Sequence, residues 1–160
     1  MRTVLDIGAG EGRWYPTLRR LRAGVAYTGV DSSRWAVRHW ASRRHLRLGS
    51  IDMLDQLDLV GPFDLIVVAD VLHYLPDEVL HLGMRQVRER LGGVAYLPTF
   101  TANDEIEGDK AGFQRRDTAA YRRVFRNAGL VELGMFAWTT AERAGELSGL
   151  QVPGGGRPRY

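Results

Sequence analysis

The sequence predicts an α/β protein with a doubly wound, mostly parallel sheet that carries helices on both faces. Residues 4–12, VLDIGAGEG, read as a short apolar strand that runs into a glycine-rich turn and then a helical pattern. Apolar runs alternate with amphipathic helical stretches along the chain, which is typical of a parallel sheet. The run FDLIVVA at 63–69 is continuously apolar and rich in β-branched residues, as expected of a central strand buried on both faces.

The individual elements follow from periodicity. Trp14, Leu18 and Leu21 recur at helical spacing, with arginines on the other side, and Gly24 ends this helix. The first strand begins at Thr3. Further strands are expected at residues 25–30, 46–51, 63–69, 94–97 and 131–140, and further helices at 33–44, 77–91 and 117–128.

Boundary residues support these ranges. Ser32 and Ser33 are candidate N-caps of the second helix, and Asp117 is the expected N-cap of the last one. Gly92 and Gly93 are expected to stop the helix at 77–91 before the next strand begins.

Length and composition predict one domain. The chain has 160 residues, of which 44% are apolar, so it can bury a core of its own. We assign residues 1–140 to the folded domain and 141–160, a short helix-like piece followed by PGGGRPRY, to a partly disordered tail. No apolar run approaches the roughly 20 residues of a membrane span, and no signal peptide is recognisable, so no membrane association and a cytoplasmic location are expected.

Cysteine and basic residues restrict the function further. The chain has no cysteine, which excludes disulfides, thiolate metal sites and cysteine nucleophiles; no metal site is predicted. The formal net charge is +3, and Lys110 is the single lysine among 22 basic residues. The arginines fall in separate pairs along predicted helices and one loop, which favours solvated surfaces over a nucleic-acid-binding stripe.

The glycine-rich turn predicts a nucleotide-type ligand. Gly8, Gly10 and Gly12 allow a tight turn against which a ligand can lie. A dinucleotide fingerprint needs a further glycine where this chain has Arg13. Asp6 places a carboxylate just before the turn, which disfavours a phosphate and suits a cationic ligand.

The segment that reads Asp6, Ile, Gly8, Ala, Gly10, Glu, Gly12 resembles the first motif of the class I, Rossmann-like, S-adenosylmethionine-dependent methyltransferases, an acidic residue followed by xGxGxG. The resemblance covers residues 3–140. It implies a methyltransferase with S-adenosylmethionine as cofactor. It also implies that Asp6, Gly8, Ala9 and Gly10 hold the methionine end of that cofactor.

Two later strand ends extend the predicted cofactor site. Asp31 follows the second strand, where a carboxylate can accept both ribose hydroxyls, with Ser32 beside it. A capping role is the alternative for Asp31. Asp52 follows the third strand, and the family resemblance implies that it accepts a hydrogen bond from the adenine amino group, with Met53 against the ring.

The segment after the fourth strand reads DVLHYL and is similar to small-molecule members of the family. Asp70 is implied at the methionine end of the cofactor and Tyr74 in the acceptor pocket. His73 is the candidate catalytic base, because an imidazole can remove a proton from a hydroxyl or ammonium acceptor at neutral pH. A packing role for His73 is the alternative. In the long loop at 99–116, Phe113 and Arg115 are the candidate acceptor contacts.

Two family features are missing from the sequence pattern. Helices usually precede the first strand, and the last antiparallel strand has no clear counterpart except a short stretch at 150–152. A partner chain or a homo-oligomer is one way to cover the cofactor. We predict methyl transfer to an oxygen or nitrogen of a small-molecule acceptor; the alternatives are a nucleic-acid or protein methyltransferase, or a non-catalytic cofactor-binding subunit of a methyltransferase complex.

Overall fold

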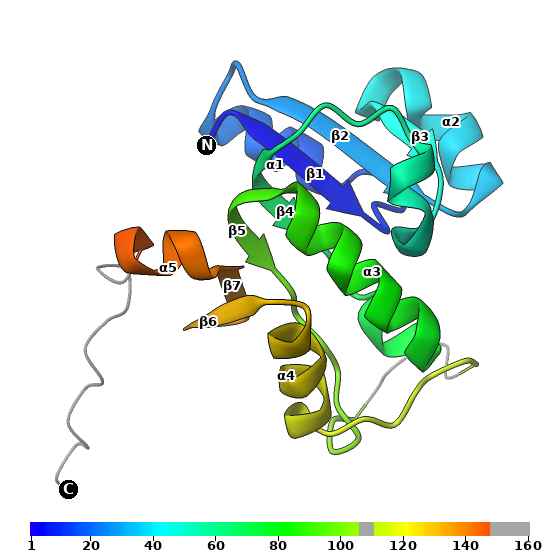
Figure 1. Ribbon diagram of the computed structural model, residues 1–160. Coiled ribbons are helices and arrows are strands. Elements are labelled where there is room, and N and C mark those ends of the chain that lie inside the picture. Colours follow the sequence, from blue (N-terminus) through cyan, green and yellow to red (C-terminus); the bar gives the residue numbers. More distant parts are fainter. Residues whose placement is uncertain (106–110, 148–160) are drawn as a thin grey trace, which may run out of the picture.

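A computed structural model describes residues 1–105 and 111–147 and confirms the predicted α/β architecture (Figure 1). The strands are β1 (Thr3–Ile7), β2 (Ala26–Asp31), β3 (Leu46–Leu48), β4 (Phe63–Val67), β5 (Leu91–Tyr96), β6 (Leu130–Gly134) and β7 (Ala137–Thr140). The α-helices are α1 (Trp14–Leu21), α2 (Arg34–Arg44), α3 (Asp77–Arg90), α4 (Thr118–Asn127) and α5 (Ala141–Leu147), and two 3₁₀ helices are η1 (Ile51–Gln56) and η2 (Leu72–Tyr74).

The seven strands form one sheet in the order β3-β2-β1-β4-β5-β7-β6. Strands β1 to β5 pair in parallel, and β7 runs antiparallel to both β5 and β6. Strand order reverses between β1 and β4, so their carboxyl ends border a topological switch point, where ligands bind in folds of this kind. The site therefore belongs at the carboxyl edge of the parallel strands.

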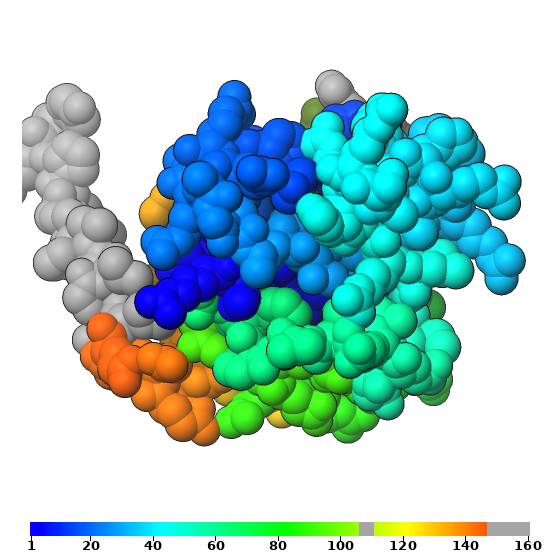
Figure 2. Space-filling model, turned by 90° about the horizontal axis from the view of Figure 1, so that it is seen from above, coloured from blue at the N-terminus to red at the C-terminus, as the bar shows by residue number. Residues whose placement is uncertain are grey.

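Two apolar clusters hold the helices on the sheet. The larger cluster packs η1, α3 and α4 against the sheet, and the smaller one packs α1 and α2. Seen from above, α5 and the first residues lie on one side of the molecule and α2 on the other (Figure 2). No helix within the described residues is long and apolar enough to cross a membrane.

The predicted helix caps are confirmed. The Ser33 hydroxyl accepts a hydrogen bond from the Ala36 N–H, and the Asp117 carboxylate accepts one from the Ala120 N–H. Each satisfies a backbone donor that the first helical turn leaves open. These side chains fix where α2 and α4 begin.

The predicted boundary between α3 and β5 is wrong. Strand β5 starts at Leu91, directly after the helix, and includes both glycines that were expected to form a connection. The register shifts here, because one residue of β4 opposes two of β5. A Cβ on Gly93 would lie 2.2 Å from the Asp64 carbonyl oxygen, so a bulge with this close backbone approach requires glycine.

The sheet is also completed differently from the prediction. The stretch expected as one strand at 131–140 is a hairpin, β6 and β7, which turns at Met135 and Phe136, both with left-handed backbone. The hairpin supplies the last antiparallel strand, so the expected lack of that strand is wrong. Strand β3 ends at Leu48, three residues earlier than predicted, and η1 follows it. The stretch 150–152 and the predicted tail after 147 lie outside the described residues.

Candidate functional site

Three backbone N–H groups of the glycine-rich turn after β1 are already hydrogen-bonded to the end of β2. The N–H groups of Gly8 and Ala9 both donate to the Val30 carbonyl, at 2.8 and 3.1 Å. The Gly10 N–H donates to the Asp31 carboxylate at 2.7 Å. A phosphate-binding turn presents such donors to its ligand instead. This turn therefore offers a phosphate three donors fewer than a phosphate-binding turn does, and the Asp31 carboxylate lies beside it.

The three glycines of the turn have different neighbours. A Cβ on Gly8 would lie 2.1 Å from a Val71 methyl, and one on Gly12 would lie 2.9 Å from Arg44 Cβ. Gly10 also has left-handed backbone, but nothing lies within 4 Å of its Cβ position. Gly8 and Gly12 are needed for packing, whereas the space beside Gly10 is open.

Asp31 links the turn to the start of α2. Its second carboxylate oxygen accepts a hydrogen bond from the Ser33 N–H at 2.7 Å. Each carboxylate oxygen thus has one backbone donor and keeps further acceptor capacity. Both predicted roles are compatible with this geometry, because the side chain that organises the loop can also accept hydroxyls.

Asp6 lies beneath the turn and not at its surface. Its side chain is 1% exposed, and the Tyr27 hydroxyl donates to it at 2.5 Å. Burial raises the pKa of the Asp6 carboxyl to about 6; the Tyr27 hydrogen bond opposes this rise and the charge of Asp31 adds to it. Burial and the Asp6 charge raise the pKa of Tyr27 as well. The Asp6 side chain is thus enclosed beneath the turn, where its charge can act on a ligand only through the turn above it.

Two adjoining hollows continue from the turn along the carboxyl ends of the strands. The smaller, about 70 Å³, is lined by Gly8, Asp52 and Val71 among others. The larger, about 390 Å³, has Met53 in its wall. Both are lined by Ser32, Gly49 and Ser50, so they share a wall. The two hollows together form a cleft that runs from the glycine-rich turn to Met53.

Four of the predicted cofactor residues, Gly8, Ser32, Asp52 and Met53, line this cleft, and Asp6, Ala9, Gly10, Asp31 and Asp70 are not in its wall. Ser32 and Asp52 line it, and Met53 is exposed in its wide part. The Ser50 hydroxyl donates to the Asp52 carboxylate at 2.5 Å and orients it. Ala9 is buried in the smaller apolar cluster, and its N–H and carbonyl are both hydrogen-bonded within the protein.

On the other side of the turn, β4 leads to Asp70 and His73. Asp70 is exposed and has left-handed backbone, a conformation that non-glycine residues adopt mainly at special sites. His73 is 1% exposed, and its Nδ1 has no hydrogen-bond partner among the described residues. Burial lowers the pKa of the His73 imidazole, and the charge of Asp70 opposes this shift. His73 is therefore neutral at pH 7.

Three aromatic rings surround the His73 imidazole. Its ring centroid lies 4.3 Å from Tyr74, 5.1 Å from Phe100 and 5.7 Å from Phe113. The structure thus brings two predicted acceptor residues, Tyr74 and Phe113, to the predicted base. Arg115 is exposed, and no contact places it in this group.

Sequence reasoning missed Arg116, which holds this region together. Its guanidinium donates to the Leu75 carbonyl at 2.6 Å and to the Asp77 carboxylate, and it also reaches the Leu72 carbonyl. The end of the long loop is thereby tied to η2, which carries His73. No local pattern distinguishes Arg116 from its neighbour. Tyr27 was missed for a similar reason, since its partner Asp6 is 21 residues away.

A metal centre has no support in the described residues. They contain no group of three or more histidine, cysteine, aspartate or glutamate side chains placed to hold an ion.

Comparison with known proteins points to one family. The family model described as a methyltransferase domain matches residues 2–145. No curated protein sequence matches the chain significantly.

Solved structures show the same fold at low identity. The O-methyltransferase NcsB1 from neocarzinostatin biosynthesis, solved with S-adenosyl-L-homocysteine, is 20% identical with a TM-score of 0.67. The match covers 86% of this chain and 49% of the NcsB1 chain. The plantazolicin methyltransferase BamL is 16% identical with a TM-score of 0.65, covering 81% and 56%. A methyltransferase in complex with the Haloferax volcanii Trm112 methyltransferase activator is 24% identical with a TM-score of 0.62, covering 81% and 61%. The chain thus spans about half the length of such proteins.

Proposed function

The chain belongs to the methyltransferase family whose domain it matches, and from this premise we propose that it transfers a methyl group from S-adenosylmethionine to a small-molecule acceptor. The acceptor atom is an oxygen or nitrogen. The observation that carries the proposal is the use of the loop donors: the N–H groups that would bind a phosphate are taken by Val30 and Asp31.

A cationic adenosine ligand suits this loop for an electrostatic reason. S-adenosylmethionine carries a sulfonium and an ammonium group against one carboxylate, so negative charge nearby favours it. Asp31 provides that charge at the surface of the turn, and Asp6 provides it below.

The proposed binding roles follow the cleft. Gly8, the Ala9 backbone and Gly10 hold the methionine end with Asp70 nearby, and Asp31 and Ser32 bind the ribose. Asp52 accepts the hydrogen bond of the adenine amino group. Met53 packs against the adenine ring, as its exposed position in the larger hollow permits.

When bound, S-adenosylmethionine would supply an electrophilic methyl carbon to the lone pair of the acceptor. The carbon–sulfur bond would break with its electron pair left on sulfur, and the acceptor would lose a proton. His73 is proposed to take that proton, because burial keeps its imidazole neutral. Tyr74, Phe113 and Arg115 are proposed to position the acceptor. Alignment of the reacting atoms provides the remaining rate enhancement.

The charge distribution supports a small molecule over a nucleic acid. Several arginines are paired with carboxylates: Arg88 with Glu142, Arg116 with Asp77, and Arg122 and Arg126 with Glu132. Paired guanidinium groups contribute less to the binding of phosphates than free ones. A protein acceptor and a non-catalytic subunit remain the competing proposals, and the Haloferax volcanii relative solved with its activator favours including a partner chain in the tests.

Calorimetric titration with S-adenosylmethionine tests the proposal. We expect saturable binding, and no binding of a dinucleotide of similar size. Release of labelled methyl product from a panel of phenols and amines then tests turnover. Folded protein without affinity for S-adenosylmethionine contradicts the proposal, and binding without turnover across the panel favours the subunit alternative.

A further inference from the structure

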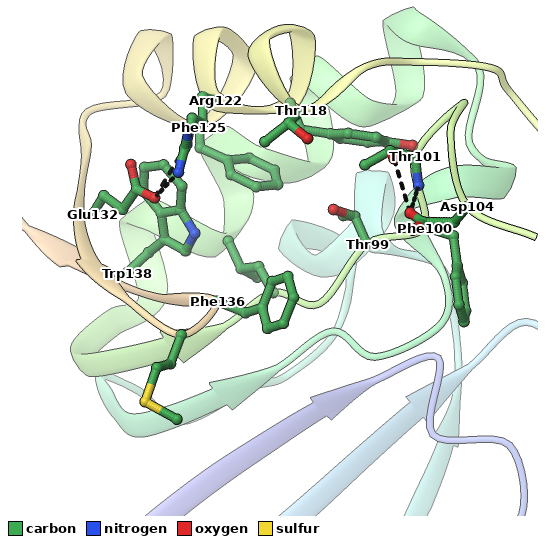
Figure 3. A pocket seen from close by; sticks show the side chains of 13 residues that line it. Thr99, Phe100, Thr101, Asp104, Thr118, Arg122, Phe125, Glu132, Phe136 and Trp138 are labelled. Carbon is green, nitrogen blue, oxygen red and sulfur yellow. Dashed lines mark hydrogen bonds and ion pairs between the residues drawn. The ribbon is translucent and has the colours of Figure 1, made fainter. Parts of the chain in front are cut away.

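A second hollow, of about 480 Å³, lies away from the cofactor cleft (Figure 3). Its wall comes from the segment after β5, from α4 and from the β6–β7 hairpin. A volume of this size is within the roughly 300–1,000 Å³ of small-molecule pockets. None of the residues predicted from the sequence lines it.

The inner wall of this hollow is aromatic. Tyr121, Phe125 and Trp138 are buried side by side, with ring centroids 6.1 Å apart for the first two and 5.0 Å apart for Phe125 and Trp138. Phe136 and Phe100 stand at the rim, where they are 54% and 39% exposed. Figure 3 shows the Phe125 and Phe136 side chains directed toward the same space. Such a wall favours a planar ring system.

The charged groups around the hollow disfavour an anion. Arg122 donates to Glu132 at 2.8 Å and is neutralised by it. The Asp104 carboxylate accepts hydrogen bonds from the Thr101 N–H and hydroxyl. The described lining therefore carries one cation and two carboxylates. Threonine hydroxyls, the Tyr121 hydroxyl and the Trp138 indole N–H are the other polar side-chain groups of the described lining.

Phe100 is shared between the wall of the hollow and the aromatic group around the proposed base. Phe100 lines the hollow, and its ring also contacts the His73 imidazole at 5.1 Å between centroids. We propose that this hollow binds the acceptor, which is a planar, uncharged aromatic molecule. This inference rests on the proposed function and names the substrate class. The acceptor's rings occupy the hollow, and its nucleophilic group lies at the rim beside Phe100, the lining residue whose ring contacts His73.

Methylumbelliferone and its phosphate ester provide a matched pair of probes. Both have the same planar ring system, and the first is uncharged while its hydroxyl is protonated. We expect saturable binding of methylumbelliferone to the protein without cofactor, and at least about tenfold weaker binding of the ester. An ester that binds as tightly as the parent compound overturns the proposed ligand class.

Variants locate the bound probe. Phe136→Ala should weaken methylumbelliferone binding by about tenfold, because it removes one exposed ring from the rim. The matched control is Trp35→Ala, which removes a 58% exposed ring from α2 outside the hollow and should leave the affinity unchanged. Thr118→Phe adds a ring within the hollow and should abolish binding. Equal affinity in Phe136→Ala, Thr118→Phe and the unaltered protein overturns the inference, provided that circular dichroism shows them folded.

Probe binding in the hollow can be tested independently of the proposed methyl transfer. Contacts from the probe to the Trp138 indole, observed by nuclear magnetic resonance, support the hollow whether or not methyl transfer occurs. Binding of S-adenosylmethionine together with no saturable binding of methylumbelliferone overturns this inference alone. Failure to bind S-adenosylmethionine contradicts the proposed function and leaves the probe's binding as a separate measurement.

Discussion

Replacing Asp6 with asparagine should make the protein more stable at high pH and nearly unchanged at low pH. The carboxyl is buried beneath the glycine-rich turn, and its pKa rises from 3.8 to about 6 on folding. The folded state therefore holds the Asp6 proton more tightly than the unfolded chain does. Stability must then fall as pH rises through the interval between these two values, because the unfolded state is the first to ionise.

The magnitude follows from the size of the shift. A difference of roughly two pKa units at 1.36 kcal/mol per unit gives about 3 kcal/mol by pH 8. At pH 4 the carboxyl is protonated in the folded state, and the penalty is only about 0.5 kcal/mol. Asparagine is neutral throughout and can still accept the Tyr27 hydrogen bond. The stability advantage of the Asp6→Asn variant should therefore grow by about 2.5 kcal/mol from pH 4 to pH 8.

Urea denaturation followed by circular dichroism at pH 4, 6 and 8 measures the difference. A second variant, Tyr27→Phe, removes the hydrogen bond that lowers the pKa of Asp6. Its stability should fall more steeply with pH than that of the unaltered protein. A constant difference between Asp6→Asn and the unaltered protein at all three pH values would refute the argument from burial.

Three further predictions concern the site. Asp31→Ala should weaken S-adenosylmethionine binding by about ten- to a hundredfold, since charge-assisted hydrogen bonds are worth about 1.5 to 3 kcal/mol; calorimetry showing unchanged affinity removes Asp31 from the site. His73→Gln should spare cofactor affinity but lower kcat by at least about a hundredfold and remove the fall of kcat at acidic pH; equal turnover leaves only a packing role. Gly8→Ala should lower Tm more than Gly10→Ala, because a Cβ on Gly10 meets no neighbour. Gly10→Ala should mainly weaken cofactor binding. The reverse order in thermal unfolding and in titration contradicts this assignment of Gly10.

Local signals predicted most of the fold. Apolar runs identified the parallel strands, because a strand buried on both faces needs little more than a continuous apolar sequence. Ser33 and Asp117 identified helix starts, because a cap bonds to its own helix within a few residues. Apolar runs and helix caps depend only on residues close together in the sequence, so both can be recognised without knowledge of tertiary contacts.

The errors arose where distant segments decide the backbone. Gly92 and Gly93 look like a helix stop, but Gly93 is required because the backbone of Asp64 passes close to it. The β6–β7 hairpin turns at Met135 and Phe136, which lack the glycine or asparagine usual at left-handed turn positions. The Leu97 N–H donates to the Phe136 carbonyl, so contact with the end of β5 helps to hold this turn.

The candidate site shows the same division. The sequence located the glycine-rich turn and its carboxylates. It could not show which of the three glycines has open space beside it. That depends on Val71 above Gly8, on Arg44 beside Gly12, and on the empty space at Gly10.

The end of the second strand, and not the glycine motif, determines which backbone N–H groups of the glycine-rich turn are free. The end of β2 contributes the Val30 carbonyl and the Asp31 carboxylate, and together they accept three N–H groups of the turn. A glycine turn beside a strand that ended without these acceptors would keep its donors free for an anion. In this protein the end of β2 therefore occupies three donors of the turn, and the glycine motif alone does not reveal this.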